Sequence, residues 1–132
     1  MNKESLLKTI AELDLTFSED RGAEMGDFFA KDAKLMFSLM PDVIGRESIR
    51  DLFVKFVSMY TTDSWEPKRE LIRVYERDAY TLGSFIEVRT KRSEGVTETV
   101  YGRLLEIWEL SSEDKWELTH FMSGRYAETG LV

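Results

Sequence analysis

The first half of the chain carries apolar residues at three- and four-residue steps, the spacing that places side chains on one face of a helix. This spacing predicts a helix over residues 3–21, a short helix over 23–30 and a longer helix over 46–60. The apolar face of the first helix consists of Leu6, Leu7, Ile10, Leu13 and Phe17. The apolar face of the third helix consists of Ile49, Leu52, Phe53, Phe56 and Tyr60.

One acid falls within the apolar face of the first helix. Asp14 follows Ile10 by four residues and precedes Phe17 by three, so all three side chains share that face. An acid in such a position either has a functional role or lies at the edge of the face, where it reaches water. Both interpretations stay open at the level of the sequence.

Alternation of apolar and polar residues replaces the helical spacing in the second half of the chain. It predicts a half-buried strand over 34–40, and, after the polar segment 61–64 and Pro67, further strands that are joined by short turns. These further strands cover residues 69–77, 79–91, 97–110 and 115–126. Short links favour antiparallel neighbours. Helices followed by strands predict an α+β fold in which three N-terminal helices pack on one face of a bent, mostly antiparallel sheet.

The overall composition is that of one globular domain, which we expect to span residues 1–132. Apolar residues make up 42% of the chain and charged residues 33%. No apolar run approaches the roughly 20 residues that span a bilayer, and acids interrupt the N-terminal segment where a secretion signal has its apolar part. We therefore expect a cytoplasmic protein with no membrane partner.

The content of cysteine, histidine and charge excludes several chemistries. The chain has no cysteine, which excludes disulfides, thiolate nucleophiles and cysteine-based metal sites. His120 is the single histidine, so a multi-histidine zinc site is excluded as well. The net charge of −7 argues against nucleic acid, because phosphate contacts need clustered lysine and arginine. We expect neither a metal nor another cofactor.

Three segments resemble the nuclear transport factor 2-like superfamily, in particular its SnoaL-like and ketosteroid-isomerase-like branch. The segment FSEDRGAEMGDFFAKDAKLMF resembles the family's passage from the first helix into the first strand. The segment IGRESIRDLF resembles the start of its third helix, and EIWELSSEDKWELTHFMSG resembles its closing hairpin. Together the segments span nearly the whole chain.

The resemblance implies a cone-shaped α+β barrel with an interior pocket, a small hydrophobic ligand and frequent homodimerisation through the sheet. The superfamily includes isomerases, dehydratases and cyclases as well as non-enzymatic domains, so the fold alone does not assign a reaction. Many relatives have a second histidine two positions after the one that matches His120, where this chain has Met122. The tyrosine-and-two-acids set of ketosteroid isomerases and the Asp-Arg-Asp set of epoxide hydrolases have no match here.

Alternation in the last strand places Trp116, Leu118, His120 and Met122 on one face, which we expect to be buried. The turn before it does not fix the register, and a one-residue slip exchanges the two faces. In one register Leu105 lies opposite His120; in the other, Glu106 does. We favour Leu105, because this register leaves Glu106 on the outer, more polar face.

The favoured register predicts a pocket that His120, Tyr101, Arg103, Trp116 and Met122 line from the sheet. The helices and the first strand would add Asp14, Phe17, Phe37 and Phe56. Asp14 or His120 would transfer a proton to or from a small hydrophobic carbonyl compound, and Tyr101 or Arg103 would stabilise the oxyanion that develops. Such chemistry would suit a cofactor-independent isomerase, dehydratase or cyclase.

Two interpretations compete with catalysis. A cone-shaped interior with aromatic walls suits passive binding of a small apolar molecule. The favoured register also places Trp108 and Phe121 on the outer face of the sheet, where exposed aromatic residues predict a two-fold homodimer.

Overall fold

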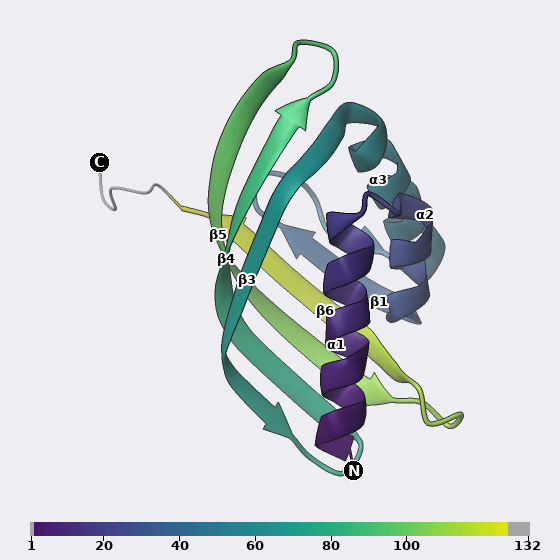
Figure 1. Ribbon diagram of the computed structural model, residues 1–132. Helices are drawn as coiled ribbons and strands as arrows, with labels where there is room; N and C mark the ends of the chain where they lie inside the picture. Colours follow the sequence, from purple (N-terminus) through teal and green to yellow (C-terminus); the bar gives the residue numbers. More distant parts are fainter. Residues whose placement is uncertain (1, 127–132) are drawn as a thin grey trace.

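The computed structural model describes residues 2–126 and consists of a helical layer on the concave side of a curved sheet (Figure 1). The helices are α1 (Asn2–Ser18), α2 (Gly22–Met25) and α3 (Arg46–Met59), with a 3-10 turn η1 (Gly26–Phe28) after α2. The predicted α+β class is therefore confirmed. Among the described residues, no helix combines the length and apolar character that crossing a membrane requires.

Six strands form the sheet within the described residues, in the order β2-β1-β6-β5-β4-β3. They are β1 (Phe29–Phe37), β2 (Val43–Ile44), β3 (Tyr60–Val74), β4 (Asp78–Lys91), β5 (Val96–Leu110) and β6 (Trp116–Arg125). Neighbouring strands are antiparallel except β1 and β6, which are parallel. The predicted curvature and mostly antiparallel pairing are confirmed. The sheet does not close into a barrel, because β2 and β3 remain as its edges.

The sequence predicted that the polar segment 61–64 and Pro67 separate the helical half from the strands, and this prediction is wrong. They lie inside β3, which begins at Tyr60 directly after α3. Proline has no N–H to donate to a neighbouring strand, and β3 tolerates it because it is an edge strand that pairs with β4 on one side only. The first strand also differs, since it starts at Phe29 rather than at Lys34.

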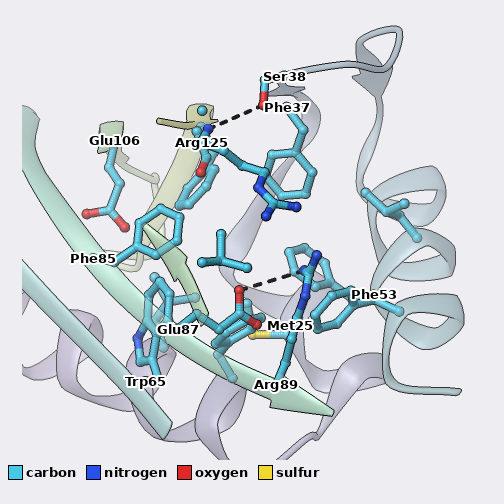
Figure 2. Close-up of a pocket in the computed structure, with 18 of the residues that line it drawn as sticks. Met25, Phe37, Ser38, Phe53, Trp65, Phe85, Glu87, Arg89, Glu106 and Arg125 are labelled. Atoms are coloured by element: carbon cyan, nitrogen blue, oxygen red, sulfur yellow. Dashed lines mark hydrogen bonds and ion pairs between the residues drawn. The ribbon is translucent and has the colours of Figure 1, made fainter. Parts of the chain in front are cut away.

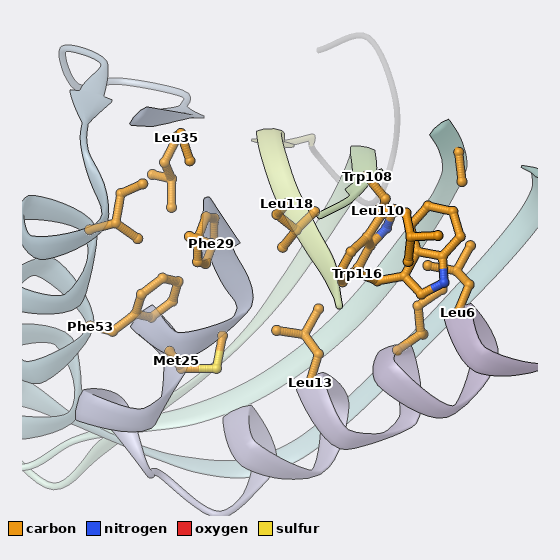
Figure 3. Close-up of a cluster of buried hydrophobic side chains, with 14 residues drawn as sticks. Leu6, Leu13, Met25, Phe29, Leu35, Phe53, Trp108, Leu110, Trp116 and Leu118 are labelled. Atoms are coloured by element: carbon orange, nitrogen blue, oxygen red, sulfur yellow. The ribbon is translucent and has the colours of Figure 1, made fainter. Parts of the chain in front are cut away.

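An apolar core joins α1 to the closing hairpin of β5 and β6 (Figure 3). Trp108 and Leu118 are fully buried, and Leu6, Ile10 and Leu13 of α1 pack into the same cluster. Trp116 is buried beside them, and its indole N–H donates a 2.9 Å hydrogen bond to the hydroxyl of Ser5. Burying side chains of this size stabilises the fold by about 1.5–3 kcal/mol each. This core fixes how α1 crosses the sheet.

The last strand carries one extra residue, which changes which of its side chains face the core. Leu118 pairs with Trp108 and His120 pairs with Ile107, so Thr119 has no partner and forms a β-bulge. The predicted pairing of His120 with Leu105 is therefore wrong, and so is the alternative with Glu106. Before the bulge, Leu118 faces inward. After it, Phe121 faces inward and His120 is exposed on the outer face.

The observed register also corrects the positions of three residues on β5 and β6. Glu106 was predicted on the outer face, but it is fully buried and pairs with Phe121. Trp108 and Phe121 were predicted to be exposed and to mediate a dimer. Trp108 is fully buried, and Phe121 packs against the core.

Candidate functional site

A cavity of about 370 Å³ lies between the helices and the concave face of the sheet. Its walls are mostly apolar and rich in aromatic rings, which come from both layers. Phe17 of α1 stacks on Phe56 of α3 at 5.9 Å and meets Trp65 of β3 edge-on at 4.7 Å. Trp65 in turn lies 5.0 Å from Phe85 of β4. The size and the apolar lining are typical of small-molecule sites in proteins.

A charged network borders this cavity. The guanidinium of Arg69 donates hydrogen bonds of 2.7 and 3.1 Å to Glu106 and of 2.8 and 2.9 Å to Asp14. Thr81 donates a 2.6 Å hydrogen bond to Glu106, and the indole N–H of Trp65 donates one of 3.2 Å to Asp14. Both oxygens of Asp14 are thus engaged. The network holds α1, β3, β4 and β5 together.

The burial of this network determines its electrostatics. The side chain of Arg69 is 7% exposed and that of Glu106 is 0% exposed. Burial by itself lowers the pKa of Arg69, but the hydrogen bonds to Glu106 and Asp14 and the negative charges of both outweigh burial and raise it. Arg69 is therefore firmly cationic, and its charge is taken up by two carboxylates.

A third acid, Glu87, lies in the wall of the cavity (Figure 2). Glu87 lies on β4, where it pairs with Trp65 on β3 and with Val100 on β5. The residue is 5% exposed, and burial raises the pKa of its carboxyl group. Among the described residues, one of its carboxyl oxygens, Oε2, has no hydrogen-bond partner.

Two arginines, Arg89 and Arg125, also line the cavity. Arg89 forms a 2.7 Å ion pair with Glu98, and its guanidinium lies 4.4 Å from the centre of the Tyr60 ring. Arg125 is half exposed and lies 3.9 Å from the same oxygen of Glu98. The backbone N–H of Arg125 donates a hydrogen bond to Ser38, in the segment between β1 and β2 (Figure 2).

The structure brings together four of the residues that the sequence nominated. Asp14, Phe17, Phe37 and Phe56 all line the cavity. Their side chains come from α1, β1 and α3, whose apolar spacing could be read from the sequence. Lining a cavity does not establish a role in catalysis or binding, so the role of each residue stays a prediction.

The other five nominated residues lie elsewhere. His120 and Met122 are exposed on the outer face of the sheet, and Trp116 is part of the core. Arg103 lies over the Tyr126 ring in a shallow depression on the outer face, and Tyr101 packs near the same ring. All five were assigned to the pocket on the assumption that the His120 face is buried. The bulge at Thr119 turns His120 and Met122 outward, and the pairing of Leu118 with Trp108 puts Tyr101 and Arg103 on the outer face.

Sequence reasoning missed the other charged residues that line the cavity, namely Arg69, Glu87, Arg89, Glu106 and Arg125. A signal existed for one of them. Glu87 alternates with Phe85 and Arg89 on β4, and Phe85 indicates that this set faces inward. Arg69 and Glu106 become partners only once the order of the strands is known. Within residues 2–126, no three side chains of the metal-binding types gather into a site.

Comparison with known proteins identifies the fold. No protein-family model matches the chain, and no curated protein sequence matches it. Solved structures are similar across nearly its whole length. A ketosteroid isomerase-like protein from Erwinia carotovora atroseptica superposes with a TM-score of 0.80 at 15% identity, covering 96% of this chain and 99% of that one. A nuclear transport factor 2-like superfamily protein from Salmonella enterica superposes with a TM-score of 0.75 at 18% identity, covering 98% and 96%.

A third similar structure belongs to a protein whose name includes its fold. It is a nuclear transport factor 2-like protein with a cystatin-like fold from Novosphingobium aromaticivorans, with a TM-score of 0.75 at 10% identity, covering 96% of this chain and 83% of that one. These superpositions establish the fold, and they do not assign a reaction or a ligand to this chain.

Proposed function

We propose that this chain, which has the nuclear transport factor 2-like fold, binds a small, mostly apolar, carbonyl-bearing molecule in its cavity. The observation that carries the proposal is the aromatic lining between α1, α3 and the concave face of the sheet. Apolar walls remove the body of such a ligand from water at about 25 cal/mol per Å² buried. The few polar groups in the wall would fix its orientation.

Calorimetric titration with 2-acetylnaphthalene, a compact aromatic ketone, tests the proposal. Val100 is buried in the cavity wall, so Val100→Phe would occupy the volume that the ligand needs. Thr99→Phe is the matched control, because Thr99 is the adjacent residue of β5 and is exposed. We expect binding to the wild type and the control and none to Val100→Phe. Equal affinity for all three proteins would place the ligand outside the cavity and contradict the proposal.

General acid–base chemistry on the bound ketone is the second candidate function, favoured by the carboxylate of Asp14 in the cavity wall. Asp14 would accept a proton from the carbon beside the carbonyl, and the electron pair of that C–H bond would move towards the carbonyl oxygen. Exchange of the methyl protons of 2-acetylnaphthalene in D₂O, followed by NMR, measures this step. Exchange no faster than in buffer alone would mean that the protein binds the ketone without catalysing proton transfer. Exchange that survives Asp14→Asn would exclude Asp14 as the base.

Homodimerisation through the outer face of the sheet can accompany either function, and we propose it on different residues from those the sequence suggested. Met122, Leu105 and Leu82 lie side by side on β6, β5 and β4, and Met122 and Leu82 are 45% and 43% exposed. A second copy would cover this apolar row by two-fold symmetry. Sedimentation equilibrium of Leu82→Glu should show a monomer, while Val54→Glu on the exposed side of α3 should leave the dimer intact.

A further inference from the structure

Glu87 occupies a position on the concave face where a carboxyl group has unusual surroundings. Its neighbours across the sheet are the indole of Trp65 on one side and the side chain of Val100 on the other. The preceding inward-facing residue of β4 is Phe85, which packs with Trp65. The residue is 5% exposed and is one of the residues that line the cavity.

The protein supplies little hydrogen bonding to this carboxyl group. The nearest cation is Arg89, whose guanidinium nitrogen lies 3.8 Å from Oε1, which is longer than a hydrogen bond (Figure 2). Arg89 is already bound to Glu98. No group within residues 2–126 hydrogen-bonds Oε2, which is itself fully buried. A buried polar atom of this kind destabilises the fold until a partner satisfies it, and the cavity is where a ligand atom would supply that partner.

The charges around Glu87 decide which form of the carboxyl group meets the ligand. Burial is the largest influence and raises the pKa of Glu87. The positive charges of Arg89 and Arg125 oppose this rise, and the negative charges of Glu98 and Asp20 add to it. Arg69, the remaining cation of the cavity wall, is bound to Asp14 and Glu106. The two acids offset part of the effect of the two cations, and burial leaves the pKa of Glu87 raised.

We propose that Glu87 acts as a neutral carboxylic acid and donates its O–H to the carbonyl oxygen of an uncharged ligand, such as a ketone, an aldehyde or an ester. This inference rests on the proposed function, since it needs an apolar ligand in the cavity, and it adds the atom that is recognised and the residue that recognises it. A protonated carboxyl group is a donor, and a carbonyl oxygen only accepts, so the two are complementary. An ammonium ligand would instead require the ionised carboxylate.

A pair of nearly isosteric probes isolates this hydrogen bond. 2-Acetylnaphthalene and 2-isopropenylnaphthalene have almost the same shape, and they differ in carrying C=O or C=CH₂ at one position. The ratio of their affinities therefore reports the carbonyl contact alone. For wild type at acidic pH we expect the ketone to bind about tenfold more tightly, which is the worth of one buried hydrogen bond. The preference should fade as the pH rises through the pKa of Glu87.

Two substitutions complete the test. Glu87→Gln keeps an N–H donor without a titrating proton, so its preference for the ketone should persist at every pH. Glu87→Leu removes the donor, so its preference should be absent at every pH. The inference is overturned if Glu87→Leu still favours the ketone, or if the preference of wild type for the ketone grows as the pH rises. If neither naphthalene binds, the proposed function fails; if both bind with equal affinity at every pH, the role of Glu87 fails and the cavity proposal stands.

Discussion

Replacing Arg69 with methionine is expected to lower the free energy of unfolding by about 3–5 kcal/mol, the usual cost of removing one partner from a buried ion pair. Methionine keeps much of the length of the side chain, but it removes all four hydrogen bonds that Arg69 donates to Asp14 and Glu106. The loss is unequal at the two carboxylates. The side chain of Asp14 is 24% exposed and water can solvate it, whereas that of Glu106 is 0% exposed.

Most of the cost should therefore come from Glu106, whose charge would keep one hydrogen bond, from the hydroxyl of Thr81. A second substitution, Glu106→Gln, removes that charge and keeps an acceptor for Thr81. The double variant Arg69→Met/Glu106→Gln should accordingly regain the larger part of the stability that Arg69→Met loses.

Urea denaturation followed by tryptophan fluorescence and circular dichroism measures these differences, provided that the m-values agree among the variants. Arg73→Met is the matched control, because Arg73 lies on the same strand but is exposed, and it should change stability by no more than about 0.5 kcal/mol. A loss for Arg69→Met no larger than the control's would refute the reasoning. So would a double variant that is less stable than Arg69→Met.

Three further predictions follow from the packing of the sheet. Gly102→Ala should cost about 1–3 kcal/mol by urea denaturation and weaken binding of 2-acetylnaphthalene, because a Cβ at this position would overlap the Phe85 ring and force it towards the cavity. His120→Ala should alter stability by no more than about 0.5 kcal/mol and leave the affinity for that ketone unchanged, since His120 is exposed on the far face of the sheet; a lost affinity would restore it as a candidate. Because burial raises the pKa of Glu87 in the folded state, the stability it contributes is fully present below the ordinary glutamate pKa and is lost as the pH rises through the folded-state value. Urea titrations over a pH series should thus show wild type losing stability relative to Glu87→Gln as the pH rises, and parallel curves would contradict this.

The architecture could be predicted from the sequence because it depends on local periodicity. The spacing of Leu6, Ile10 and Leu13 predicts a helix whether or not its partner is known, and these three residues are buried as expected. Leu7 departs from this pattern and is 41% exposed, since it lies at the margin of the apolar face. The strand over Tyr60–Val74 was missed in part because its polar residues and Pro67 suit an edge strand, which a sequence does not distinguish from a loop.

The site was harder to predict because it depends on register. No residue type marks Thr119 as the extra residue of a bulge, yet that residue decides whether His120 or Phe121 faces inward. The partnership of Arg69 with Glu106 likewise joins strands that are not adjacent in the sheet, since β4 lies between them. Such contacts arise from the curvature of the whole sheet, and curvature leaves no local trace in the sequence.

The parallel pairing of β1 with β6 has a consequence for how the chain folds. Lys34 pairs with His120, so the edge of β1 that faces β6 cannot form its hydrogen bonds until β6, the last strand of the chain, reaches it. The hairpins formed by β3, β4 and β5 close through short connections and can form early. Contacts between residues so distant in sequence slow folding, because the entropy of closing the intervening loop is lost before the contacts form. We expect the docking of β1 on β6 to be among the last steps of folding, and the cavity, which both strands help to line, to take shape only then.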